Sequence, residues 1–329
     1  MFKMPLSTLA ACFSMISCIA MAQDISSEEK ITDGDIAKEG ITKERLAQDN
    51  KLFITLATKF LHWEEPQEPF HIAGPLYFVG TRGLSSFLFV TSQGDILLNT
   101  GDPKSGPMIE ASIKKLGFKP EDIKIMINGH GHSDHAGGFA YLKKLSSAQL
   151  AIMEPDVAML EDGGKSDFHY GKDWEVMGQD PVQVDRVLRD GDRVSLGDVT
   201  LTGYNTPGHT RGSTTWITHV TEAGKTYEVV FPDGDGFNPG YRLAGPKADY
   251  PGIADDYRRT HHFHEMLKPD IWFGYHTEYF NMQGKLKRAA AEGVNAWVDP
   301  EGYREFIAGK KRAFEDEMDS ELGVAVSKK

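Results

Sequence analysis

The stretch IKIMINGHGHSDHAGG, residues 123–138, passes from an apolar run directly into a cluster of three histidines and one aspartate. The run from Ile123 to Asn128 is rich in apolar and β-branched residues, which predicts a short buried strand. In extended geometry the side chains of residues i and i+2 lie on the same face, so His130 and His132 can point at one metal ion. The stretch therefore predicts a metal site at the end of a strand.

Two further candidate ligands follow in the same stretch. Asp134 and His135 lie where the chain turns into a helix predicted over residues 139–145. The cluster offers more ligands than one tetrahedral zinc ion needs, which indicates two adjacent metal ions. The competing interpretation is a polar loop that happens to be rich in histidine. The strand–loop–helix placement and the two later histidines favour the metal site.

Strand-like and helix-like segments alternate along the rest of the chain. Strands are predicted at residues 76–79, 86–90, 95–98, 149–152, 186–188, 199–202, 213–217, 227–231 and 271–273. Helices are predicted at residues 52–63, 107–116, 155–161, 254–268 and 301–322, the first of them capped by Asp49 and Asn50. This alternation in both halves predicts a layered α/β domain with two sheets.

The first 22 residues differ from the remainder of the chain. A start that carries Lys3, an apolar stretch and the ending Ala20-Met21-Ala22 predict a secretory signal peptide, with Gln23 as the mature N-terminus. Residues 23–50 are predicted to be a polar lead-in, and residues 51–329 a single domain. We therefore expect a periplasmic or secreted protein without membrane insertion.

Charge and cysteine content restrict the function classes further. The formal net charge of the chain is −12, and no basic run is present, which argues against nucleic-acid binding. Both cysteines, Cys12 and Cys18, lie within the predicted leader, so the mature chain has no thiolate to offer a metal. Its metal ligands must then be histidines and carboxylates.

Two more histidines lie at predicted strand ends. His209 follows the strand at 199–202 in the turn Pro207-Gly208-His209, and His276 follows the strand at 271–273. Ligands on loops that leave rigid strand ends hold metal geometry firmly. We therefore add His209 and His276 to the candidate ligands, whereas His261, His262 and His264 in the helix at 254–268 are expected to serve packing or surface roles.

The ordered set His-x-His-x-Asp-His, Pro-Gly-His and a late Gly-x-His resembles the metallo-β-lactamase superfamily, over about residues 70–314. That resemblance implies an αββα sandwich with two metal ions at the sheet edges. Within the superfamily the chain is most similar to the dizinc β-lactamases of class B, subclass 3. Their pattern implies that His130, His132 and His209 hold the first zinc ion, and that the second is held by Asp134, His135 and His276.

The resemblance also implies a reaction. A metal-bound hydroxide would open the β-lactam ring of antibiotics, with Asp134 as the catalytic residue that ligates and orients the nucleophile. The expected partner is a small-molecule β-lactam, and we expect a monomer. Arg242, just after Pro239-Gly240-Tyr241, is our candidate for binding the substrate carboxylate.

Three positions depart from the family pattern. Asn99 stands where many members carry an aspartate that supports the site, and Thr210-Arg211-Gly212 replaces the usual Thr-Pro-Gly. The stretch Asp233-Gly234-Asp235 offers no hydroxyl where the subclass usually has a serine that binds the substrate carboxylate. Asp233 or Asp235 is a candidate bridging ligand of both metals, as in related thioesterases and lactonases. An exported lactonase or glyoxalase-II-like thioesterase is therefore the alternative function, and a non-enzymatic zinc-binding protein is a third.

Overall fold

The computed structural model describes residue 45 and residues 48–324, so the predicted signal peptide and most of the polar lead-in lie outside the described residues. The first well-defined element is helix α4 (Asn50–Phe60). The Asp49 side chain accepts a hydrogen bond from the Leu52 N–H at 2.9 Å, which confirms the predicted cap. The helix ends earlier than the predicted residue 63, and His62 has a positive φ of 56°.

The first sheet has seven strands in the order β1-β2-β3-β4-β5-β6-β7. Its first four strands pair antiparallel, and β4 to β7 pair parallel. Their bounds are β1 (Phe70–Ala73), β2 (Leu76–Phe78), β3 (Phe87–Thr91), β4 (Gly94–Leu98), β5 (Ile123–Ile127), β6 (Gln149–Met153) and β7 (Arg186–Leu188). The predicted strand before the histidine cluster is thus the central parallel strand β5.

The second sheet has five strands in the order β12-β11-β10-β9-β8. Strands β8 to β11 pair antiparallel, and the short β12 pairs parallel with β11. Their bounds are β8 (Asp192–Leu196), β9 (Val199–Asn205), β10 (Thr214–Glu222), β11 (Lys225–Phe231) and β12 (Ile271–Trp272). His209 and His276 follow β9 and β12, as the sequence predicted.

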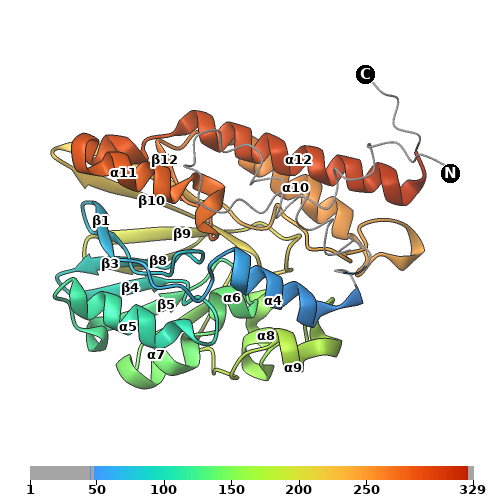
Figure 1. Cartoon of the computed structure of the whole chain (residues 1–329), viewed down its shortest axis with the longest axis horizontal. Coiled ribbons are helices and arrows are strands. Elements are labelled where there is room, and N and C mark those ends of the chain that lie inside the picture. The colour runs from blue at the N-terminus through green and yellow to red at the C-terminus, as the bar shows by residue number, and fades with distance from the viewer. Residues whose placement is uncertain (1–44, 46–47, 325–329) are drawn as a thin grey trace.

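The sheets lie face to face between two layers of helices (Figure 1). A large apolar core joins both sheets, and the rings of Phe87 and Phe231 meet in it with centroids 4.9 Å apart. The outer face of the first sheet carries α5 (Ser105–Lys115), α7 (Phe139–Ser146) and α8 (Val157–Asp162). Against the second sheet lie α10 (Ile253–Met266), α11 (Met282–Glu292) and α12 (Pro300–Leu322). The predicted αββα sandwich is confirmed.

Several short or polar elements were not predicted. Strand β8 is an edge strand in which exposed polar residues alternate with buried Val194, so it lacks the apolar signal of a central strand. Helix α11 is rich in lysine, arginine and alanine, and its start is capped by Asn281, whose side chain accepts from the Gly284 N–H at 3.2 Å. The short helix α9 (Trp174–Met177) and strand β1 were also missed. Edge position and short length weaken the periodic signal of such elements.

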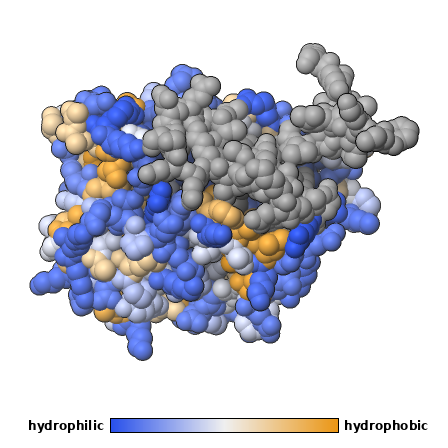
Figure 2. Space-filling model, viewed as in Figure 1, coloured by the Kyte–Doolittle hydropathy of each residue, from blue (hydrophilic) through white to orange (hydrophobic). Residues whose placement is uncertain are grey.

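The face shown in Figure 2 is largely hydrophilic and carries small groups of hydrophobic residues. Among the described residues, no helix combines the length and the apolar composition needed to cross a bilayer.

Asp95 in β4 is a buried carboxylate, 2% exposed, whose pKa burial raises to about 6. Between about pH 4 and pH 6 the native state then binds more protons than the unfolded state, so native stability falls as the pH rises through this window. Asp95→Asn removes this dependence. We expect its unfolding free energy, relative to that of the unchanged protein, to increase from about pH 4 to about pH 6 and then level off. Urea unfolding across that range measures the difference, and a constant difference at every pH contradicts the prediction.

Candidate metal centre

The loop after β5 is anchored to the second sheet. The Trp216 Nε1–H donates to the Asn128 carbonyl at 2.7 Å, and the Thr214 N–H donates to the Gly129 carbonyl at 2.7 Å. A Cβ at Gly129 would lie 1.9 Å from the ring of Tyr275, so only glycine fits there. Asn99 supports the same loop, because its Oδ1 accepts from the Gly129 N–H at 2.8 Å. The family's aspartate position is thus filled here by a backbone-supporting amide.

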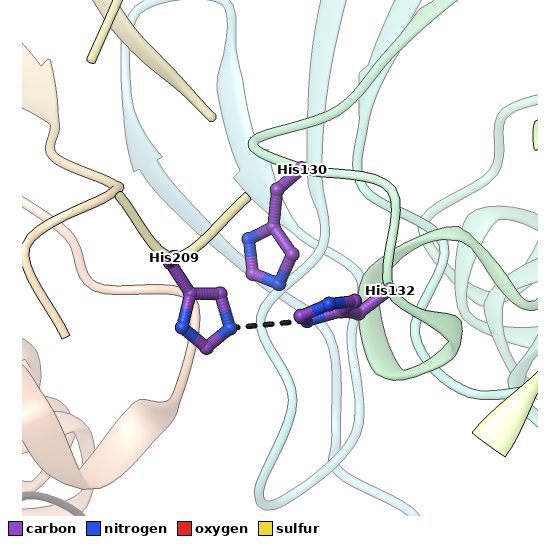
Figure 3. Close-up of side chains that lie close together, drawn as sticks. All are labelled: His130, His132 and His209. Carbon is purple, nitrogen blue, oxygen red and sulfur yellow. Dashed lines mark hydrogen bonds between the residues drawn. The ribbon is translucent and has the colours of Figure 1, made fainter. Parts of the chain in front are cut away.

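His130, His132 and His209 come together in one group (Figure 3). The candidate ligand atoms of the three side chains all lie within 4.8 Å of one another, and His132 Nδ1 lies 3.1 Å from His209 Nε2. The three histidines come from two loops, one after β5 and one after β9. Segments about 75 residues apart in sequence thus meet at one end of the sandwich.

The outer nitrogen of each ring faces a hydrogen-bond acceptor. His130 Nδ1 lies 2.9 Å from Asp233 Oδ2, and His132 Nε2 lies 3.1 Å from Asp167 Oδ2. His209 Nδ1 lies 3.1 Å from the Gly236 carbonyl. Each acceptor places the proton on the outer nitrogen and leaves the lone pair on the inner one. His130 Nε2 is buried without a hydrogen-bond partner among the described residues, as a metal ligand requires.

A second group is formed by His130, Asp134 and His135, whose candidate ligand atoms also lie within 4.8 Å of one another. Asp134 and His135 belong to the one-turn helix α6 (Ser133–Ala136). Asp134 Oδ2 lies 3.2 Å from His135 Nε2 and 3.5 Å from His276 Nε2. The structure thus brings all six predicted ligand side chains to one place: five form two groups that share His130, and His276 lies beside Asp134.

The electrostatics of the centre suit metal binding. Burial, together with neighbouring imidazoles, holds the pKa of His130 and of His209 well below the usual value, and that of His276 at about 3. These rings are neutral at physiological pH and keep their ligand lone pairs. Burial alone would raise the pKa of Asp134, but the interaction of its carboxylate with His135, by charge and by hydrogen bond, lowers that pKa well below the usual value. The Asp167 carboxylate, by contrast, raises the pKa of His132 against the effect of burial. Imidazoles beside a carboxylate are the donor set that zinc accepts.

Asp156 at the start of α8 holds two ligand loops together, a role that the sequence did not reveal. Its Oδ2 accepts from the Gly131 N–H at 2.8 Å and from the Thr210 hydroxyl at 2.7 Å, and its Oδ1 accepts from the Gly212 N–H at 2.7 Å. Gly131 lies between His130 and His132, and Thr210 follows His209. Burial raises the pKa of this carboxyl to about 6. The carboxylate therefore joins the two loops that carry the three-histidine group.

The ligand side chains open into a cavity. Its lining includes His130, His135, His209 and His276, the carboxylates Asp233 and Asp235, the lysine Lys310, and an aromatic wall of Phe237, Tyr275, Tyr279 and Phe306. Arg242 is exposed and is not one of the described residues that line this cavity. The preceding residue, Tyr241, turns inward instead and donates its hydroxyl to the His209 carbonyl at 2.9 Å. The structure thus does not bring the predicted carboxylate-binding arginine to the site.

The two candidate bridging aspartates face other partners. Asp233 Oδ2 lies against the outer nitrogen of His130, and Asp235 Oδ2 lies 3.3 Å from His264 Nδ1 in α10. Neither belongs to the two close ligand groups found in the described part of the chain. His264 Nε2 also lies 2.7 Å from the Thr215 hydroxyl, and His261 Nε2 lies 3.2 Å from the Asp235 carbonyl, so both histidines pack under the loop as expected.

Asp233 is expected to tune the affinity of the three-histidine group. Asp233→Ala removes the acceptor of His130 Nδ1, so the ring can rotate or change its tautomer. Since the loss of such a hydrogen-bond partner usually weakens metal binding by roughly 10–100-fold, we expect a decrease of that order in zinc affinity. Competition with a zinc chelator measures the effect. Asp255→Ala on the exposed first turn of α10 is a matched control. Unchanged zinc affinity in Asp233→Ala contradicts the positioning role.

The family model described as the metallo-beta-lactamase superfamily matches residues 79–220. The chain is similar to the native FEZ-1 metallo-β-lactamase from Legionella gormanii, with 42% identity and a TM-score of 0.76 over 78% of this chain and 98% of that one. It is also similar to BJP-1, a subclass B3 metallo-β-lactamase of Bradyrhizobium japonicum, with 36% identity and a TM-score of 0.73 over 79% and 97% of the two chains.

The curated relatives share shorter segments. A probable metallo-hydrolase of Burkholderia pseudomallei is 30% identical over 52% of this chain and 60% of its own length. A hydroxyacylglutathione hydrolase of Rhodopseudomonas palustris is 28% identical over 41% and 43%, and an N-acyl homoserine lactonase of Bacillus cereus is 35% identical over 16% and 30%. The chain thus spans less than two thirds of the length of these relatives.

Proposed function

The chain belongs to the metallo-β-lactamase superfamily, and from this we propose that it is an exported zinc-dependent hydrolase that opens the β-lactam ring of antibiotics. The observation that carries the proposal is the gathering of six candidate ligand side chains in one place, four of them lining one cavity, with a hydrogen-bond acceptor at the outer nitrogen of each of His130, His132 and His209. Similarity to subclass B3 metallo-β-lactamases over nearly their full length supports this choice of substrate.

The residues present fit two zinc ions. His130, His132 and His209 would hold one ion, and Asp134, His135 and His276 would hold the other. When bound, zinc lowers the pKa of water toward neutrality and polarises a substrate carbonyl, so it supplies both the nucleophile and electrophilic assistance.

Asp134 would orient the reactants. Its Oδ2 faces His135 and His276, which leaves Oδ1 to accept a hydrogen bond from the attacking water. Because its pKa is held well below the usual value, it remains a carboxylate in the working pH range. The aromatic wall of the cavity, which includes Tyr275 and Phe306, would exclude bulk water around the substrate.

Export is part of the proposal. The features of residues 1–22, with an apolar stretch and a small-residue ending, are those of a cleaved leader, and a periplasmic or secreted location would bring the enzyme to antibiotics before they reach their targets. N-terminal sequencing of the secreted or periplasmic protein tests this part, with Gln23 as the expected first residue.

Hydrolysis of a chromogenic cephalosporin and of a carbapenem by the purified mature protein tests the activity, with added zinc and with a chelator. We expect rapid turnover that requires zinc and is lost with the chelator. Zinc-loaded protein that hydrolyses neither compound contradicts the proposal.

A lactonase or thioesterase is the second candidate. The partial similarity to a hydroxyacylglutathione hydrolase and to an N-acyl homoserine lactonase favours it, as does the absence of a serine at residues 233–236. Turnover of an acyl lactone or a glutathione thioester, at a rate well above that of any β-lactam, would assign this function instead.

A further inference from the structure

Lys310 occupies an unusual position on α12. The buried face of this helix carries Tyr303, Ile307 and Phe314 at helical spacing, and Lys310 falls on the same face with 6% of its surface exposed. Its Nζ lies 4.2 Å from the ring centroid of Tyr279 and 5.2 Å from that of Phe306. A buried ammonium group is costly unless it is paired, so a lysine here calls for a partner.

The end of this side chain reaches the cavity of the metal centre. Lys310 lines the same cavity as His130, His209 and His276. A Cβ placed on Gly236, in the loop that follows β11, would lie 3.2 Å from Lys310 Nζ. Among the lining residues within the described ranges, Lys310 is the one lysine or arginine.

No carboxylate of the described residues lies within 4.0 Å of Lys310 Nζ, the distance of an ion pair. Asp235, which lines the same cavity, faces another partner, because its Oδ2 lies 3.3 Å from His264 Nδ1. By contrast, the neighbouring Lys311 is only partly buried and is ion-paired with Glu265 at 2.7 Å. The Lys310 ammonium thus retains donors that face the cavity and its aromatic wall.

The structure also explains why the loop at residues 233–236, which follows β11, offers no hydroxyl to bind a substrate. Gly234 has a φ of +91°, and a Cβ there would lie 1.7 Å from the Thr206 carbonyl oxygen, so a serine does not fit. Arg242 is exposed and does not line the cavity within the part of the chain that the structure describes. The site therefore needs a cation from elsewhere if its substrate is an anion.

We propose that Lys310 binds the carboxylate of the substrate while the reacting bond lies over the six metal-binding side chains. This inference rests on the proposed hydrolase function and names the residue that selects anionic substrates. The aromatic rings of Tyr279 and Phe306 hold the lysine stem, and the ammonium forms a charge-assisted hydrogen bond with the carboxylate in a site screened from bulk water.

Ligands that differ only in charge test this role without requiring turnover. A series of ω-mercaptocarboxylates of increasing chain length, each paired with its primary amide, anchors through the thiol to the zinc-loaded protein. We expect the best-fitting carboxylate to bind about 10–100-fold more tightly than its amide, as measured by calorimetry, and Lys310→Gln to lose this preference. Lys311→Gln and Arg242→Gln should retain it.

Lys310→Met provides a second variant, because it keeps the length of the stem and removes the buried charge. Zinc content and the unfolding midpoint of both variants should match those of the unchanged protein. An equal carboxylate preference in the unchanged protein and both variants, or no preference in the unchanged protein at any chain length, overturns the inference.

The two proposals fail separately. If the protein hydrolyses a cephalosporin, Lys310→Gln should raise KM about tenfold or more with little change in kcat, since the interaction is made in both ground and transition states. If no β-lactam is hydrolysed but the carboxylate preference depends on Lys310, the β-lactamase proposal fails and the anion site stands. If Lys310→Gln changes neither KM nor the preference for carboxylate ligands, the hydrolase proposal stands and the proposed role of Lys310 is wrong.

Discussion

Asp134→Ala is expected to lower kcat about 1,000-fold and to reduce bound zinc from about two ions to about one per chain. The carboxylate is the one anionic group within the two close ligand groups, and its Oδ2 lies 3.2 Å from His135 Nε2 and 3.5 Å from His276 Nε2. Without it, the two remaining histidines present only neutral donors to a divalent ion. The three-histidine group retains all of its ligands, so one ion should stay bound.

Metal analysis of the dialysed protein and initial rates with a cephalosporin measure the two effects. Asp134→Asn is the matched variant, because it keeps the volume and one oxygen ligand but loses the charge, and its zinc content and rate should fall between those of the two other proteins. Asp255→Ala, on an exposed helical turn, should leave both unchanged. Full activity in Asp134→Ala would contradict the two-ion mechanism.

Asp156→Ala is expected to destabilise the zinc-free protein by about 3–5 kcal/mol. The substitution leaves three buried donors without a partner, namely the N–H groups of Gly131 and Gly212 and the hydroxyl of Thr210, and each unsatisfied buried donor costs about 1–3 kcal/mol. The measurement uses denaturant unfolding in excess chelator, so that lost zinc binding does not contribute to the difference.

The same variant should also bind zinc more weakly, because Asp156 joins the loops that carry His132 and His209. Asp156→Asn keeps one oxygen acceptor and the side-chain volume, and its loss of stability should be smaller. Unfolding of Asp156→Ala at the same denaturant concentration as the unchanged protein means that the loops are held by other contacts, such as the Thr214–Gly129 hydrogen bond.

Much of the fold and of the ligand set could be predicted from local patterns. The apolar run before His130 predicts β5, and the alternation of strands and helices predicts the two-sheet sandwich. The missed elements lie where the local signal is weak: β8 is a polar edge strand, and α11 is a charged surface helix. Periodicity reports how one element faces the core, so elements with little buried surface leave little trace in the sequence.

The residues that support the metal ligands could not be predicted from the sequence for a different reason. Asp156 lies 25 residues from Gly131 and 56 from Gly212, and Asp233 lies 103 residues from His130. An isolated aspartate in a turn has many possible partners, and spacing alone does not select among them. Only one feature of the sequence points to Lys310: it is a lysine on the apolar face of a helix, between Ile307 and Phe314.

The sequence by itself determined which side chains are available to bind metal and which strand ends carry them, because these depend on residue type and on spacing within single segments. The tertiary structure decided that Asp233 faces the outer nitrogen of His130, that Arg242 is exposed, and that Lys310 reaches the cavity. These outcomes depend on how segments far apart in the chain pack against one another. Burial and hydrogen-bond partners are set by that packing, and it has no counterpart in the local pattern of the chain.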